Sequence, residues 1–119
     1  MPLYQNELIY IEHEPSEIPW LKIFTQTPYK ELTDAPEEVR CELWRAMEAI
    51  ERTMRSHFNT DKINIASFGN YVPHLHVHVM ARFHDDSFFP EPMWGTKQRE
   101  GSYRMQDFDI FIEKLLRTL

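Results

Sequence analysis

The sequence predicts one α+β domain, residues 1–119, in which a long helix and a C-terminal helix cover one face of an antiparallel sheet. Three observations predict this fold. Short β-branched and apolar runs occur in two pairs, a long segment with helical periodicity separates the pairs, and a second amphipathic segment follows them. A chain of 119 residues also has the length of one compact domain.

The first pair of predicted strands covers residues 8–12 and 21–25, two short runs rich in apolar and β-branched residues. The residues Glu-Pro-Ser at 14–16 separate the two runs, and Thr-Pro at 27–28 follows the second. Proline and serine in such clusters favour turns. We therefore expect two strands joined by a turn.

The long helix is predicted over residues 34–58. Asp34 can cap its start, an early proline is tolerated there, and the glutamates at 37 and 38 suit the positive end of a helix dipole. Apolar residues then recur every three or four positions in one stripe: Val39, Leu43, Met47, Ile50 and Met54. We expect this stripe to pack on the sheet.

The second pair of strands is predicted at residues 62–68 and 72–82, joined around Gly69-Asn70. A last amphipathic helix is predicted near residues 106–117. Between these elements, residues 84–104 contain prolines at 90 and 92 and glycines at 95 and 101. This composition predicts a long covering loop without regular structure.

Composition restricts the classes of function. Thirteen Lys/Arg against nineteen Asp/Glu give a net charge of −6, which argues against a nucleic-acid surface but allows a small phosphorylated ligand. No apolar run approaches the ~20 residues of a membrane helix, and the N-terminus is unlike a signal peptide. Cys41 is the single cysteine, so we expect a cytoplasmic protein. Three glycines in all provide neither a P-loop nor the dinucleotide-binding motif.

Three of the six histidines fall within five positions. Residues two apart on a strand share a face, so His74, His76 and His78 line one face of the 72–82 strand. The aliphatic residues between them line the other face, which we expect to pack under the helices. The histidines then face a cleft or solvent. Three interpretations follow: a polar face without a role, a metal site, or covalent catalysis in which one imidazole attacks phosphorus.

The metal interpretation is limited by geometry. Three consecutive same-face positions span about 13 Å on a straight strand. Three imidazoles would need strong distortion to surround one zinc ion at ~2.1 Å. Two of the histidines, completed by ligands from elsewhere, form the metal alternative.

The stretch HLHVHVM at 74–80 resembles the histidine triad, H-φ-H-φ-H-φ-φ, of the HIT superfamily of nucleotide hydrolases and transferases. All seven positions fit. The resemblance extends over the two N-terminal strands, the long helix and the strand that carries Asn64, and so covers roughly residues 4–83. The continuation ARF at 81–83 and the later WG at 94–95 are similar to small bacterial members described as diadenosine polyphosphate hydrolase-like.

The resemblance implies a mechanism. His76 would attack the α-phosphorus of a nucleotide and form a nucleotidyl-imidazole intermediate that water hydrolyses. The backbone carbonyl of His74 would fix the tautomer of His76, and His78 would favour the developing charge or the leaving group. No metal or other cofactor is needed. The family also implies an antiparallel sheet of about five strands, and a homodimer with Trp94 and residues 84–104 as interface or lid elements.

Asn64 and Asn70 match family positions whose side chains hold the phosphate or the leaving group; for each, a turn or edge asparagine is the alternative. In a two-residue hairpin at Gly69-Asn70, Asn64 would pair with Leu75 and point away from the histidines. The isoleucines at 63 and 65 would then join the histidine face. A shift of one residue puts Asn64 opposite His76 and both isoleucines on the core face, so we expect this second register.

The resemblance and the strand pattern suggest further substrate-binding candidates. Many members carry an acidic residue after the first long strand to hold the ribose. His13 occupies the aligned position here, so Glu12 or Glu14 would serve. Arg82 extends the histidine face and could meet a second phosphate, with an exposed salt bridge as the alternative.

The base pocket of the family is aliphatic and built from the first strands. Ile9, Ile11 and Ile23 are therefore candidates, with ordinary core packing as the alternative. The function that fits best is a nucleotide hydrolase acting at the α-phosphate of a dinucleoside polyphosphate, a nucleoside phosphoramidate or a related adenylate. The alternatives are a non-catalytic nucleotide-binding or signalling protein and a zinc-binding protein.

Overall fold

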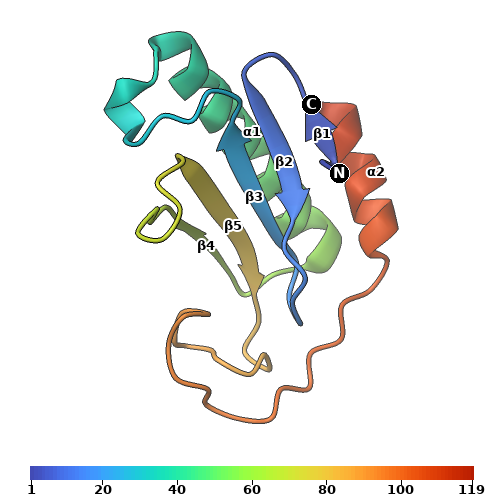
Figure 1. The fold of residues 1–119 in the computed structure, drawn as a ribbon. Helices are drawn as coiled ribbons and strands as arrows, with labels where there is room; N and C mark the ends of the chain where they lie inside the picture. The colour runs from blue at the N-terminus through green and yellow to red at the C-terminus, as the bar shows by residue number, and fades with distance from the viewer.

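The computed structural model describes residues 1–119 and contains a five-stranded antiparallel sheet in the order β1-β2-β3-β5-β4. Two helices and a short 3-10 helix accompany the sheet (Figure 1). The elements are β1 (Tyr4–Gln5), β2 (Ile9–His13), β3 (Trp20–Thr25), η1 (Leu32–Asp34), α1 (Glu37–Phe58), β4 (Lys62–Ala66), β5 (His76–Arg82) and α2 (Phe108–Thr118). The predicted α+β fold is confirmed.

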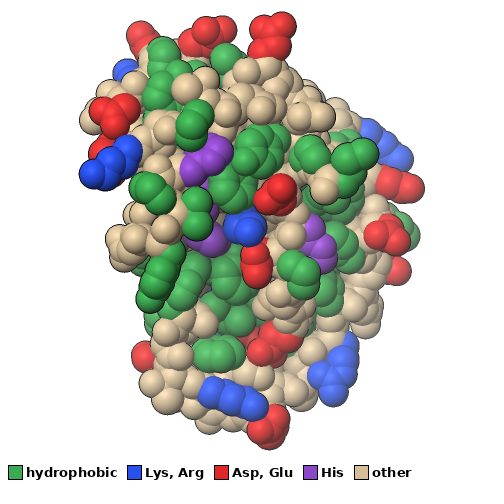
Figure 2. All heavy atoms as spheres, in the orientation of Figure 1, with side chains coloured by type: hydrophobic (Ala, Val, Ile, Leu, Met, Phe, Trp, Pro, Cys, Tyr) green, Lys and Arg blue, Asp and Glu red, His purple; other side chains and the backbone are tan.

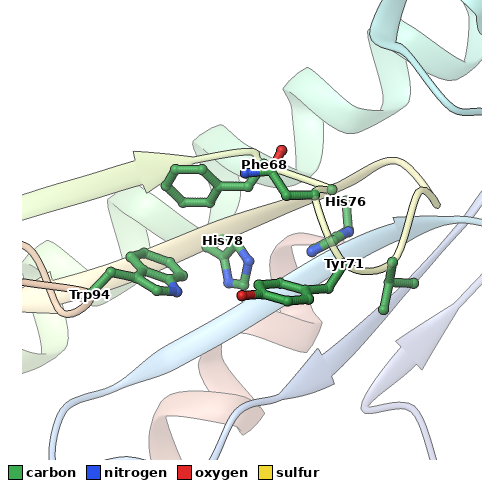
Figure 3. A pocket seen from close by; sticks show the side chains of 8 residues that line it. Phe68, Tyr71, His76, His78 and Trp94 are labelled. Atoms are coloured by element: carbon green, nitrogen blue, oxygen red, sulfur yellow. The ribbon is translucent and has the colours of Figure 1, made fainter.

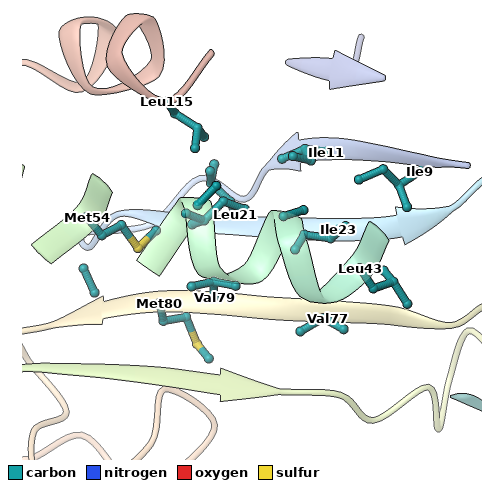
Figure 4. Packing of buried hydrophobic residues seen from close by; sticks show 14 of the residues in the cluster. Ile9, Ile11, Leu21, Ile23, Leu43, Met54, Val77, Val79, Met80 and Leu115 are labelled. Carbon is teal, nitrogen blue, oxygen red and sulfur yellow. The ribbon is translucent and has the colours of Figure 1, made fainter. Parts of the chain in front are cut away.

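The core lies between the sheet and α1. Figure 1 shows α1 behind the strands, with α2 at the side of β1. Both helices contribute buried side chains, and so do the core-facing positions of the three central strands (Figure 4). The fully buried members are Ile9, Ile11, Leu21, Ile23, Ile50, Met54, Val79 and Phe111, among others. The apolar residues that alternate along the strands therefore pack against those that recur every three or four positions on α1, as the sequence predicts.

Helix α1 begins three residues later than predicted. Asp34 ends the short 3-10 helix η1, and its carboxylate accepts a hydrogen bond from the backbone N–H of Glu31 at 3.1 Å. Ala35 is extended because a residue that precedes proline is disfavoured in the helical region. Pro36 therefore occupies the N-cap position, and the helix ends at Asn59, which adopts a left-handed conformation with φ 53°.

The β4–β5 register corrects the predicted one. Asn64 pairs with Met80, not with His76, and Ala66 pairs with His78. Asn64 still lies on the histidine face, and Ile63 and Ile65 lie on the opposite one, as the apolar pattern predicts. A slip of an even number of residues preserves both faces, so that pattern cannot distinguish these two registers. The connection between the strands is correspondingly longer and takes up residues 67–75.

The segment between β5 and α2, residues 83–107, contains no helix or strand, as predicted. Asp86 organises its start: this fully buried carboxylate binds the guanidinium of Arg82 and accepts hydrogen bonds from the N–H groups of Phe83, Phe88 and Phe89. Figure 1 shows the segment looping below the end of the sheet before it reaches α2. No helix in the structure has the length and hydropathy needed to cross a bilayer.

Candidate functional site

The face of the sheet turned away from α1 carries the histidines. On β5, His76 and His78 alternate with the buried valines. The β3–β5 pairing places Phe24 beside His76 and Lys22 beside His78, while Trp20 pairs with Met80. Figure 2 views this face and shows histidine side chains among apolar ones, close to a basic side chain with acidic neighbours. The site is therefore built on rigid strands.

His76 has a defined tautomer. Its Nδ1 donates a hydrogen bond to the backbone carbonyl oxygen of His74 at 2.6 Å. A carbonyl oxygen only accepts, so in the neutral ring Nδ1 carries the proton and Nε2 keeps its lone pair. The ring stacks on Phe24, with centroids 4.9 Å apart and an interplanar angle of 19°. Nε2 of His76 is therefore available as a nucleophile or base.

His74 anchors this arrangement to the neighbouring strand. Its Nε2 donates to the carbonyl oxygen of Thr25, the last residue of β3, at 2.6 Å. The edges of Tyr10 and Phe24 also contact its ring. Because the His74 side chain is held by β3, its carbonyl group is held in the position that receives the His76 proton. His74 thus positions His76 through both its side chain and its backbone.

His78 has the opposite tautomer. The indole Nε1 of Trp20 donates to Nδ1 of His78 at 3.0 Å. An indole N–H cannot accept, so Nδ1 must be unprotonated and Nε2 carries the proton of the neutral ring. Burial, followed by the charges of His76 and Lys22, lowers the pKa of His78 to about 4. At neutral pH, His78 is therefore an uncharged Nε2–H donor.

A pocket of about 350 Å³ opens beside the two rings. The 67–75 connection and the segment after β5 line it together with His76 and His78: Phe68, Gly69, Asn70, Tyr71, Val72 and Trp94. Figure 3 shows the imidazoles between Phe68 and Tyr71, with Trp94 at one end. Gly69 has φ +72°, which glycine adopts without strain where the loop turns. The pocket thus places aromatic walls next to a nucleophilic nitrogen and a hydrogen-bond donor.

A family model, the HIT domain, matches residues 3–85. The chain belongs to the HIT family. Its fold is similar to that of a histidine triad protein of Bradyrhizobium japonicum, with 28% identity over 99% of this chain and 89% of that chain and a TM-score of 0.80. A histidine triad protein of Marinobacter aquaeolei VT8 has 28% identity over 100% of this chain and 88% of that chain, with a TM-score of 0.79. A histidine triad protein of Sinorhizobium meliloti 1021 is also similar, with 26% identity over 100% of this chain and 89% of that chain and a TM-score of 0.79. No curated protein matches the chain.

The structure places Arg82 and Asn64 away from the pocket that His76 and His78 line. Arg82 is 1% exposed, and its guanidinium binds Asp86 at 2.9 and 3.1 Å and donates to Oδ1 of Asn64 at 2.8 Å. These contacts occupy the groups that would meet a phosphate. Both the second-phosphate interpretation and the exposed-salt-bridge alternative for Arg82 are corrected: it forms a buried structural ion pair. Asn70, by contrast, lines the pocket.

The isoleucines predicted for the base lie on the helix face of the sheet, whereas Glu12, predicted for the ribose, lies on the histidine face. Ile9, Ile11 and Ile23 are fully buried on the helix face, so they belong to the core and cannot line a pocket on the histidine face. Glu12 pairs with Lys22 on the histidine face. Glu14 binds the Lys22 ammonium at 2.9 Å.

His13, at the position aligned with the family's ribose-binding residue, takes no part in the site. It lies on the helix face, where its ring stacks on Phe108 of α2 at 4.3 Å. Its Nε2 is buried without a hydrogen-bond partner, and burial lowers the pKa of its imidazole.

Sequence reasoning missed Trp20, Phe68 and Tyr71. Alternation on β3 carried a signal for Trp20, since residues 20, 22 and 24 must share the face opposite the buried Leu21 and Ile23. No comparable signal exists for Phe68 and Tyr71, because the length of the 67–75 connection decides where they lie. No cluster of three or more His, Cys, Asp or Glu side chains in the structure could hold a metal ion.

Proposed function

We propose that this HIT protein is a nucleotide hydrolase that cleaves at the α-phosphate of a nucleotide conjugate through a nucleotidyl-histidine intermediate on His76. One observation carries the proposal: Nδ1 of His76 donates to the carbonyl oxygen of His74, which leaves Nε2 unprotonated at the edge of a pocket. The conjugate is a dinucleoside polyphosphate, a nucleoside phosphoramidate or a related adenylate.

In the first step, Nε2 of His76 forms a bond to the α-phosphorus while the bond from phosphorus to the leaving group breaks, and the leaving group takes the electron pair. The His76 ring then carries a positive charge. Its hydrogen bond to the His74 carbonyl becomes charge-assisted and so stronger than in the free enzyme. An interaction that strengthens along the reaction lowers the barrier.

In the second step, a water oxygen attacks the phosphorus and the phosphorus–nitrogen bond breaks. Nε2 recovers its lone pair, the nucleoside monophosphate is released, and one proton from the water goes to solvent. His78 donates its Nε2–H to phosphate or leaving-group oxygens as negative charge develops. Removal of one such donor typically lowers kcat by about 10²–10³-fold. We therefore expect this loss for His78→Ala.

Two surfaces beside His76 suit the ends of such a substrate. The pocket of Phe68, Tyr71, Val72 and Trp94 offers apolar and aromatic walls, with Asn70 at its rim. On the other side, Tyr10 and Phe24 stack with centroids 5.1 Å apart on the histidine face. Glu12, next along β2 on the same face, is the acidic side chain that we propose for the ribose hydroxyls. Lys22 adds a positive charge close to His78.

A turnover assay with a fluorogenic adenylate tests the proposal against its two alternatives. The hydrolase should release the fluorophore, whereas a non-catalytic nucleotide-binding or signalling protein would bind nucleotide without release. A zinc protein would contain stoichiometric metal after purification, and its activity would be lost with EDTA and restored by zinc. We expect turnover that EDTA does not affect, since no step above uses a metal or another cofactor.

We further propose a homodimer that acts in a reducing cytoplasm. Strand β4 is an edge strand of the sheet, and its Ile65 is 49% exposed, which suits pairing with a second copy. Cys41 is free and exposed, as is compatible with a reducing compartment. Light scattering should give a mass near twice 14.4 kDa, and an active monomer would contradict the dimer proposal.

A further inference from the structure

The indole N–H of Trp20 points at the one nitrogen of His78 that faces β3, and the two atoms are 3.0 Å apart. Trp20 is half-buried at the start of β3, so the contact joins two rigid strands. Trp94 closes the other side: its ring lies edge-on to both Trp20 and His78, with centroid distances of 5.2 and 4.9 Å. Phe68 packs against Trp94 in turn at 4.8 Å. The His78 ring, 8% exposed, is thus enclosed by aromatic side chains on β3 and two loops.

From this geometry we propose that Trp20 is a positioning residue that keeps His78 a neutral Nε2–H donor, and that the site consequently favours leaving groups that depart as anions. The proposal rests on the proposed function, because it concerns the group expelled when His76 attacks phosphorus. It goes beyond that function by separating two classes of conjugate, those joined through phosphate oxygen and those joined through an amine nitrogen.

The hydrogen bond opposes protonation of His78. A second proton would have to enter at Nδ1, which already accepts from Trp20, and the indole N–H has no lone pair to accept in exchange. The titratable groups that face His78 act in both directions. Burial is the largest cause and lowers its pKa, His76 on β5 and Lys22 on β3 lower it further, and Glu14 after β2 raises it. The aromatic rings of Trp94 and Phe68 bring no charge.

A neutral imidazole N–H stabilises an oxyanion by hydrogen bonding, but it is a weak acid and transfers its proton poorly at neutral pH. A phosphate leaving group departs as a stable anion and needs only the hydrogen bond. An alkyl amine departs from phosphorus only after its nitrogen has gained a proton, which a neutral His78 does not supply. Among conjugates of one nucleotide, the phosphoanhydride is therefore the better substrate and the alkyl phosphoramidate the poorer one.

Nitrogen-15 NMR of the imidazoles measures the protonation state of His78, and its dependence on Trp20, without any assay of activity. In the wild-type protein, His78 should show a protonated Nε2 and an unprotonated Nδ1, with no titration above about pH 5. Trp20→Phe keeps a ring but removes the donor, and a neutral hydrogen bond of this kind is equivalent to roughly one pKa unit. The titration midpoint of His78 should rise by about that amount. Trp44→Phe, an exposed tryptophan on α1, is the matched control and should leave the midpoint unchanged.

The preference for leaving groups that depart as anions is measured by kinetics with diadenosine tetraphosphate and an alkyl phosphoramidate of adenosine monophosphate. Wild type should give a higher kcat/KM for the tetraphosphate. In Trp20→Phe at about pH 5.5 the preference should shrink by up to about tenfold, the factor by which one pKa unit raises the protonated fraction of His78. A wild-type His78 that titrates near 6.5, or a midpoint and preference indifferent to Trp20→Phe, would overturn the proposal. If Trp20→Phe does not fold, wild-type NMR decides through the Trp20 indole proton signal. That signal should shift only as His78 titrates below about pH 5, and a shift in step with a midpoint near 6.5 overturns the proposal.

The two proposals fail separately. Should wild type hydrolyse neither conjugate while His78 stays neutral and responds to Trp20→Phe, the proposed function is wrong and the positioning role stands. If hydrolysis depends on His76 but Trp20→Phe leaves the titration midpoint of His78 unchanged, the positioning role of Trp20 is wrong and the proposed hydrolase function stands.

Discussion

The Nδ1 atom of His76 lies 2.6 Å from the carbonyl oxygen of His74, two residues earlier in the chain, and this hydrogen bond selects the neutral tautomer in which Nε2 of His76 keeps its lone pair. Replacement of His76 by Asn should therefore remove turnover, with kcat lower by on the order of 10⁴-fold or more. Binding of adenosine monophosphate should change little, since a nucleophile contributes little to ground-state affinity. Steady-state kinetics and calorimetric titration measure the two effects. Comparable turnover in wild type and His76→Asn would assign the chemistry to another group.

The buried pair of Arg82 and Asp86 should be structural. Both side chains are at most 1% exposed, and removal of one partner from a buried pair typically costs about 3–5 kcal/mol. Asp86→Asn should lower the free energy of unfolding in urea by this amount. Glu51→Gln, which breaks the exposed pair with Arg55, should change it by less than about 1 kcal/mol. Equal losses in the two variants would contradict the assignment of Arg82 to the core.

Stability should depend on pH through His78. Burial lowers the pKa of His78 to about 4 in the folded protein, whereas an unfolded histidine titrates near ~6.5. Between these values the unfolded chain binds more protons, so the free energy of unfolding decreases as the pH falls from about 6.5 towards 4. Urea unfolding of wild type should show a steeper decrease than that of His78→Asn. His13, whose pKa burial also lowers, is present in both proteins and cancels in the difference. Parallel curves would show that His78 is not kept neutral by the fold.

Gly101 should be needed to hold the segment that carries Trp94. A Cβ atom at this position would lie 2.6 Å from Oγ of Ser87 and 2.8 Å from Oε2 of Glu17, two groups that are hydrogen-bonded to each other. Gly101→Ala should therefore lower the free energy of unfolding by about 1–3 kcal/mol, as overpacking does. Glu100→Ala, at the adjacent exposed position, is the control and should have little effect. If Gly101→Ala is as stable as Glu100→Ala, this contact is not tight in solution.

The sequence predicts the layers of this fold and the face of each strand, because both depend on local periodicity. It does not predict which residues pair across β4 and β5. Asn64 lies on the histidine face as expected, yet a slip of four residues brings it to Met80 instead of His76 without exchanging the faces. The length of the connection between the strands decides the outcome, and nothing in the composition of residues 67–75 specifies where β5 begins.

The candidate site could likewise be predicted only in part. The alternation of histidines predicts that His74, His76 and His78 share one face of a strand. His76 and His78 do so and line the pocket, whereas His74 precedes β5 and binds the carbonyl oxygen of Thr25. The role of Arg82 could not be predicted, because it depends on Asp86 turning back four residues later to bury a carboxylate. Trp20 could be placed on the histidine face by alternation, but its bond to His78 depends on how β3 and β5 pair.

Rapid quenching tests the central claim most directly. Wild-type protein is mixed with an adenylate labelled in the adenylyl group, stopped within the first turnover, digested, and mapped by mass spectrometry. We expect an adenylyl group on the peptide that contains residues 74–82, attached at His76 through a bond that is labile in acid and stable in base, as a phosphorus–nitrogen bond is. Turnover without any such adduct, or an adduct on a residue other than His76, would contradict the account.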